Sequence, residues 1–296
     1  MKHYFFLGLF FIFSACSFNK LFLQPTKLSP STKKIRLAIE SDTSYVYFDS
    51  TSFFQPVFLS KKNDTIQTSY KITSFSFKSL SGNILNGWLL QSRTVKPSAT
   101  LLHLHGNAGF LLSQYQAMIP LLDLGFQAFV IDYSGFGFSE GKATRKNVLI
   151  DVNSMLSYVK TRSEIKNLPL VIYGQSLGGH LSAVVAAQRE ADIDALVIEG
   201  AFSSHKDIAA VGAKFLGRIF VKEQYSALKS IPKFHKPVLI IHSKEDEVIP
   251  IKLGKKLFDA ANQPKVFYEI TGAHIQGTDL YADSIASKIK LMIGLK

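Results

Sequence analysis

Residues 174–178, Gly-Gln-Ser-Leu-Gly, constrain the fold of this chain more than any other feature. They follow the apolar run 168–173 and precede a stretch with helical character. A Gly-x-Ser-x-Gly sequence between a buried strand and a helix predicts a sharp turn that strains the serine backbone. Small residues on either side let strand and helix approach closely. We therefore expect Ser176 Oγ at a helix N-terminus, where backbone N–H groups stabilise negative charge.

Apolar runs alternate with amphipathic stretches after residue 97. Within one such stretch Val152, Met155 and Val159 share a helical face. Strands that alternate with helices predict an α/β fold, in which a mainly parallel central sheet has helices on both faces. The apolar runs are residues 100–104, 127–131, 168–173, 195–198, 237–241 and 266–270.

Shorter runs of β-forming residues come earlier, at 45–48, 70–77 and 85–90. Gly82 and Asn83, between the last two runs, predict a hairpin turn. We therefore expect an antiparallel N-terminal edge on the parallel sheet.

A glycine-rich loop, His-Gly-Asn-Ala-Gly at 105–109, follows the first buried run of the α/β region. Glycines there let the backbone turn sharply and present its N–H groups. In serine hydrolases this loop supplies one oxyanion-hole donor, and the residue after the nucleophile supplies the other. We assign these donors to the backbone N–H groups of Asn107 and Leu177. His105 is expected to brace the loop, because the chain order of such sites places the base last.

A serine nucleophile works with a histidine base and a carboxylate that orients the histidine, which together form a catalytic triad. The carboxylate is expected after the apolar run 237–241, where the sequence 245–247 reads Glu-Asp-Glu. A carboxylate at that place can turn toward a histidine and hold its tautomer. Asp246 is the predicted acid, since residues 248–250 then close the loop before the next helix. Glu199, directly after another apolar run, is the alternative.

The predicted general base is His274, in a short loop between the last apolar run and a C-terminal helix. A loop position lets the imidazole reach Ser176 to take and return its proton. Histidines and carboxylates elsewhere lack metal-ligand spacing, so no metal is expected.

Together these residues resemble the α/β-hydrolase superfamily from about residue 20 to the C-terminus. The resemblance is closest to the subgroup with a His-Gly-Asn-Ala-Gly oxyanion loop, which includes esterases and acyl-thioesterases. It implies a serine hydrolase of carboxylic esters or thioesters with an acyl-serine intermediate, the triad Ser176, Asp246 and His274, and no cofactor. The insertion at about 202–235 is expected to form a small cap. The matching stretches are 105–109, 132–139, 174–179, 242–250 and 272–274.

Two other functions stay open. A serine peptidase of the same fold is the nearest enzymatic alternative, although residues 202–225 contain only Asp207 and Glu223 to hold a substrate amine. The other is a non-catalytic envelope lipoprotein that uses the fold as a binding scaffold. Such proteins often lose a triad member, whereas this chain retains all three.

A secretory signal peptide is predicted at residues 1–15, where a basic start precedes the apolar run 4–13. That run is too short for a membrane-spanning helix, which takes about 20 residues. Residues 13–16, Phe-Ser-Ala-Cys, resemble a bacterial lipobox, which implies lipidation of Cys16, the only cysteine. The acyl chains would anchor the protein in the cell envelope, at the outer membrane or periplasmic side.

Residues 16–35 are polar and contain Pro25 and Pro30, which predicts a tether before a hydrolase domain at 36–296. The net charge of +12 comes from 34 Lys and Arg against 22 Asp and Glu, spread thinly along the chain. Without a dense basic block or interleaved aromatics, nucleic acid is not expected as a partner. The expected partners are a small-molecule or lipid acyl ester or thioester and a membrane.

Overall fold

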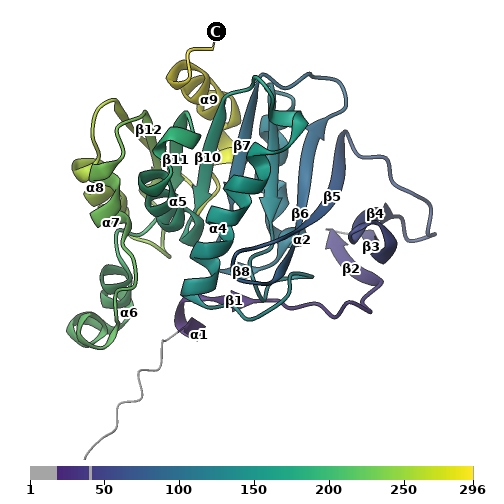
Figure 1. Ribbon diagram of the computed structural model, residues 1–296, viewed down its shortest axis with the longest axis horizontal. Helices are drawn as coiled ribbons and strands as arrows, with labels where there is room; N and C mark the ends of the chain where they lie inside the picture. Colours follow the sequence, from purple (N-terminus) through teal and green to yellow (C-terminus); the bar gives the residue numbers. More distant parts are fainter. Residues whose placement is uncertain (1–18, 40–41, 296) are drawn as a thin grey trace, which may run out of the picture.

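A computed structural model describes residues 19–39 and 42–295 of the chain (Figure 1). Its centre is an eight-stranded sheet with the order β13-β12-β11-β10-β7-β9-β6-β5. The first six strands in this order, β13 to β9 and including β7, run parallel, and β6 and β5 add an antiparallel edge. This confirms the predicted mainly parallel sheet with an antiparallel N-terminal edge. The strands are β5 (Tyr70–Lys78), β6 (Ile84–Ser92), β7 (Ala99–Leu104), β9 (Phe126–Ile131), β10 (Leu170–Gln175), β11 (Ala195–Glu199), β12 (Val238–Ser243) and β13 (Lys265–Ile270).

Helices cover both faces of this sheet, and its central strands are therefore buried along their whole length. Successive side chains of β7 enter two separate apolar clusters, Leu102 and Leu104 on one face and Leu101 on the other. The first cluster packs against α4 (Arg145–Lys160), α5 (Leu177–Gln188) and α8 (Ile251–Ala260). The second packs against α2 (Leu111–Gln114), α3 (Ile119–Leu122) and α9 (Gly277–Met292). Figure 1 shows α4 and α5 in front of the sheet.

The N-terminal stretch differs from the expected tether at 16–35. It contains α1 (Asn19–Phe22) and β1 (Gln24–Pro25), and β1 pairs in parallel with β8 (Ala108–Gly109). Phe22 and Leu23 are buried, with 6% and 4% of their surface exposed. The two residues belong to the short apolar run 21–23, which is too short to predict a packed element, and their burial fixes the segment to the body of the protein. Further on, β2 (Lys34–Ile39), β3 (Asp42–Asp49) and β4 (Gln55–Leu59) form a small antiparallel sheet.

The insertion between β11 and β12 contains α6 (His205–Phe220) and α7 (Ala227–Ser230). In Figure 1, α6 projects from the body at the lower left. Within residues 19–39 and 42–295, no helix has the length and apolar character needed to cross a membrane.

The parallel topology brings the sequence-predicted site together. The loops after β7, β10, β11, β12 and β13 all leave the carboxyl edge of the sheet. That edge is where ligands bind in open α/β sheets.

Candidate active site

Ser176 lies between β10 and α5 with φ 55° and ψ −116°, a conformation that L-residues rarely adopt. Its backbone N–H donates to the Glu199 carbonyl over 2.9 Å. A Cβ at Gly178 would lie 1.8 Å from the carbonyl oxygen of Leu104, and one at Gly174 would lie 2.3 Å from that of Gly178. Close backbone packing therefore requires both glycines of the pentapeptide, and it holds the strained serine in place.

His274 and Asp246 form a hydrogen-bonded pair, with Nδ1 of the imidazole 2.7 Å from Oδ2 of the carboxylate. The other carboxylate oxygen accepts the backbone N–H groups of Val248 and Ile249 at 2.9 and 2.8 Å. Burial alone would raise the pKa of Asp246, but hydrogen bonds from His242, His274 and the loop backbone outweigh it and lower that pKa. The carboxylate is thus ionised at neutral pH and can hold the imidazole.

A turn after β11 connects this pair to the serine. Gly200 has φ 56°, and a Cβ there would lie 3.2 Å from Cε1 of His274. The preceding residue, Glu199, accepts the Ser176 N–H. The imidazole therefore packs on the same turn that holds the Ser176 backbone. Among the described residues, no hydrogen bond joins Ser176 Oγ to His274; such contacts often tighten only when substrate binds.

Glu199, the alternative acid, is engaged elsewhere. Its buried carboxylate accepts hydrogen bonds from Tyr173 Oη at 2.7 Å, Gln175 Nε2 at 2.8 Å and the Gly277 N–H at 2.7 Å. Burial raises the pKa of this carboxyl group. The structure therefore gives His274 to Asp246 and uses Glu199 to hold the start of α9.

The glycine-rich loop lies beside the serine, since a Cβ at Gly106 would be 3.7 Å from Cβ of Ser176. His105 is buried, and its Nδ1 donates to the Gly106 carbonyl over 2.8 Å. Among the hydrogen bonds of the described residues, none is donated by the Asn107 N–H. Leu177 is the first residue of α5, where N–H groups lack partners within the helix. Both predicted donors are thus available to an oxyanion.

The loop after β9 packs against this glycine-rich loop. Tyr133 Oη donates to the His105 carbonyl over 3.0 Å. Ser134 is held from two sides, by its N–H to Asp151 Oδ2 at 2.8 Å and by Asn83 Nδ2 on its hydroxyl at 2.9 Å.

His242 is a site residue that the sequence reasoning did not assign. Its side chain is fully buried. Its Nε2 lies 2.8 Å from the Ile249 carbonyl oxygen and 3.5 Å from Asp246 Oδ2. It therefore fixes the loop that carries the acid. Its place at the end of β12, directly before that loop, is the signal that could have identified it.

A group that sequence spacing could not reveal is His180, His205 and Glu223, whose ligand-type atoms lie within 4.8 Å of one another. They come from α5, α6 and the loop after α6. The Nδ1 of His205 is already bonded to Glu223 Oε1 at 3.0 Å. Burial lowers the pKa of His180 to about 3, which keeps its imidazole neutral. The Nε2 atoms of His180 and His205 are buried and have no hydrogen-bond partner among the described residues, so each imidazole keeps one ring nitrogen that could bind a metal ion beside Glu223.

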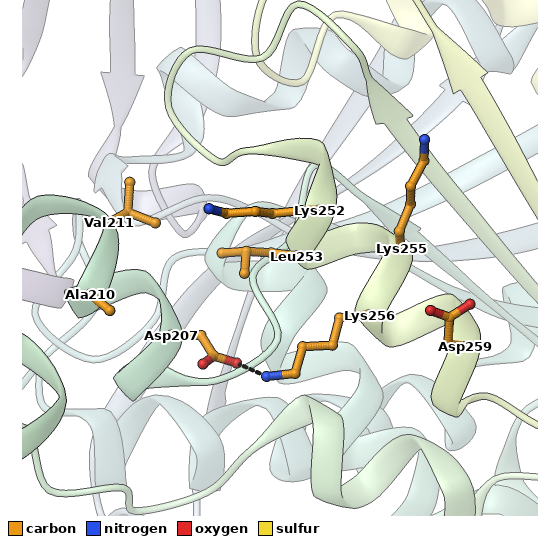
Figure 2. A pocket seen from close by; sticks show the side chains of 8 residues that line it. All are labelled: Asp207, Ala210, Val211, Lys252, Leu253, Lys255, Lys256 and Asp259. Carbon is orange, nitrogen blue, oxygen red and sulfur yellow. Dashed lines mark hydrogen bonds and ion pairs between the residues drawn. The ribbon is translucent and has the colours of Figure 1, made fainter. Parts of the chain in front are cut away.

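A groove of about 450 Å³ lies between α6 and α8, outside the triad (Figure 2). Lysines of α8 line one side, and Lys256 Nζ pairs with Asp207 at 2.6 Å.

Comparisons with known proteins agree with this architecture. Residues 99–220 match a family described as alpha/beta hydrolase fold. The YfhR protein of Salmonella typhi is 34% identical over 243 residues, which cover 75% of this chain and 83% of that protein. Alpha/beta hydrolase domain-containing protein 17B of Homo sapiens is 33% identical over 185 residues, or 62% of each protein. The Pyrococcus furiosus esterase Pf2001 has a similar structure, with a TM-score of 0.62 and 16% identity over 76% of this chain and 93% of that one.

Proposed function

The chain belongs to the α/β-hydrolase superfamily, and we propose that it is a serine hydrolase that cleaves carboxylic ester or thioester bonds. One observation carries the proposal: a serine held at φ 55° between strand and helix shares the carboxyl edge of the sheet with the hydrogen-bonded pair His274 and Asp246. The likeness of the fold to an esterase agrees with this chemistry.

In the first half of the reaction, Ser176 Oγ attacks the acyl carbon while its proton passes to Nε2 of His274. Asp246, on the opposite nitrogen, holds the ring and stabilises the imidazolium. The N–H groups of Asn107 and Leu177 stabilise the oxyanion, and losing one such donor typically costs about 2.7–4 kcal/mol. The bond to the leaving oxygen or sulfur then breaks, and His274 returns the proton to that atom.

In the second half, water attacks the acyl-Ser176 ester. His274 takes a proton from this water and delivers it to Ser176 Oγ, which leaves as the acid is released. All proton transfers thus use one imidazole.

A fluorophosphonate probe tests the nucleophile. We expect it to label the wild-type protein and the exposed-serine control Ser163→Ala, but not Ser176→Ala. Turnover of p-nitrophenyl esters and matched thioesters of increasing acyl length tests the substrate class. Cleavage of acylated peptides without ester cleavage would favour the peptidase, and no turnover of any substrate would favour the binding scaffold.

We also propose that the protein is a lipoprotein of the cell envelope, anchored to a membrane through Cys16 after removal of residues 1–15. The support is the lipobox-like sequence, and Cys16 lies outside the described residues. The substrate would then be a small-molecule or lipid acyl ester or thioester present at that membrane.

A further inference from the structure

The stretch from residue 22 to residue 28, here called the N-terminal strap, runs between two loops at the active-site edge. Figure 1 shows β1 of the strap beside β8 of the glycine-rich loop. We propose that the strap is a positioning element of the oxyanion hole and that the backbone N–H of Gln24 is its key group. The proposal rests on the proposed role of Asn107 as an oxyanion donor.

On one side the strap is bonded to the glycine-rich loop. The Gln24 N–H donates to the Asn107 carbonyl over 2.8 Å, and the Thr26 N–H donates to the Gly109 carbonyl over 2.9 Å. These bonds form a short parallel ladder. The strap thus contacts the very residue whose N–H would bind the oxyanion.

On the other side the strap is bonded to the loop after β9. The Gly137 N–H donates to the Thr26 carbonyl, and the Leu28 N–H donates to the Gly137 carbonyl, both over 2.8 Å. Lys27 Nζ also donates to the Ser139 carbonyl. The strap therefore ties the glycine-rich loop to a neighbouring loop of the sheet.

The strap is itself anchored in the body of the protein. Phe22 and Leu23 are 6% and 4% exposed and belong to the first apolar cluster, the one that packs against α4, α5 and α8. The Phe22 ring meets His205 edge-on at 4.8 Å, and the Arg145 guanidinium lies 5.0 Å from its centroid. Because Phe22 and Leu23 are buried, the start of the strap is held in place, and its hydrogen bonds to Asn107 and Gly109 restrain the glycine-rich loop.

The two peptide groups around Asn107 explain why this matters. The preceding one is fixed through the Gly106 carbonyl by His105 Nδ1 at 2.8 Å. The following one is fixed through the Asn107 carbonyl by Gln24. Because each peptide unit is planar, the His105 bond to the Gly106 carbonyl orients the Asn107 N–H, which belongs to the same unit. The Gln24 bond holds the next unit and so limits rotation about φ and ψ of Asn107, which would otherwise let the N–H turn away. Glycines at 106 and 109 leave the loop free to rotate, so the hydrogen bonds must supply the restraint.

The variant Gln24→Pro tests the proposal, since proline removes the N–H that bonds to Asn107. The matched control is Gln24→Ala, which keeps the N–H and removes only an exposed side chain. We expect Gln24→Pro to lower kcat for a p-nitrophenyl ester by about tenfold to a hundredfold at nearly constant KM, less than full loss of a donor. A boronic acid forms a tetrahedral adduct with the serine, so we expect Gln24→Pro to bind it more weakly in parallel with the loss of kcat. Gln24→Ala should match the wild type in kcat and in boronic acid affinity.

A folded Gln24→Pro protein with kcat and boronic acid affinity within twofold of wild type would overturn the proposal. A loss of kcat without weaker boronic acid binding would also overturn it, because a disturbed oxyanion hole must weaken the tetrahedral boronic acid adduct as well as the transition state. If Ser176→Ala keeps its turnover, the proposed function fails instead, whatever the strap variants do.

Hydrogen exchange on the wild-type protein tests the strap even if Gln24→Pro does not fold. The amides of Gln24 and Thr26 should exchange slowly, and the boronic acid should slow them further. Exchange at the rate of an unstructured peptide would contradict the proposal.

Discussion

His274 Nδ1 lies 2.7 Å from Oδ2 of Asp246, and this contact selects one of two candidate carboxylates. Glu199 ends β11 and Asp246 follows β12, the neighbouring parallel strand, so both carboxylates reach the same edge of the sheet. Glu199 is instead bonded to Tyr173, Gln175 and the backbone of Gly277. The two carboxylates therefore have separate tasks, which substitutions can distinguish.

Asp246→Asn is expected to lower kcat by roughly 10³–10⁴-fold, because an amide cannot hold the imidazole in the required tautomer. Glu199→Gln is expected to lower kcat by about tenfold at most and to destabilise the fold by about 1–3 kcal/mol, since it disturbs a buried hydrogen-bond network. Steady-state kinetics and urea unfolding of both variants check this. The opposite ranking of kcat would give the acid role to Glu199.

Gly178→Ala is expected to destabilise the protein by about 3 kcal/mol or more, at or above the upper end for overpacking, because the new Cβ overlaps the Leu104 carbonyl. The overlap should also displace the glycine-rich loop and lower kcat. Gly212→Ala in α6 is the matched control. It has open space around it and should gain up to about 1 kcal/mol of helix stability. Equal unfolding midpoints for the two variants would contradict the close-packing argument.

Phe22→Ala is expected to lower the free energy of unfolding by about 3–5 kcal/mol, because its ring is buried in the first apolar cluster. Phe53→Ala, at a ring that is 55% exposed, should change stability far less. Urea unfolding followed by fluorescence gives both values. If the two variants are equally stable, the segment around Phe22 behaves as a tether after all.

Acid should destabilise the protein below about pH 6.5. Burial lowers the pKa of His103 to about 3 and of His105 to about 4. Because these folded-state values lie below the unfolded value of about 6.5, their contribution to stability is complete above pH 6.5 and is lost as the pH falls toward 4. Burial raises the pKa of Asp132 to about 8, so its contribution has the opposite sign and is lost as the pH rises from about 4 to 8.

The variant His103→Gln isolates one histidine. It should reduce the slope of unfolding free energy against pH by up to about 1.4 kcal/mol per pH unit between pH 6 and pH 4, the value of one proton. His235→Gln, at an exposed ring, is the control for replacing a surface histidine. Urea titrations at several pH values measure the slopes, and identical slopes for both variants would exclude His103 as a source of acid sensitivity.

Cys16→Ser is expected to shift the protein from the membrane fraction to the soluble fraction in a bacterial host, because it removes the only thiol available for acylation. Mass spectrometry of the mature wild-type N-terminus should show an acylated Cys16. An unmodified terminus at another residue would refute the lipoprotein proposal.

Much of the sheet was predictable from local patterns. Apolar runs such as 168–173 match buried parallel strands because such strands have both faces covered and need no alternation. The serine turn was also predictable, since the glycines at 174 and 178 are required by backbone contacts only a few atoms away. The packing of the segment around Phe22 was not, because the apolar run 21–23 is too short to show a periodic pattern.

The sequence by itself determined the strand–turn–helix around Ser176 and the order of the loops that could bear an acid and a base, because both depend on neighbouring residues and on chain direction. Only the tertiary structure decided that Asp246 rather than Glu199 contacts His274, and that Gln24 bonds to Asn107. The physical reason is that hydrogen bonds act over about 3 Å. Which groups come that close depends on how segments that are distant in the sequence pack together, as for Asp246 and His274, which are 28 positions apart. No local pattern records that packing.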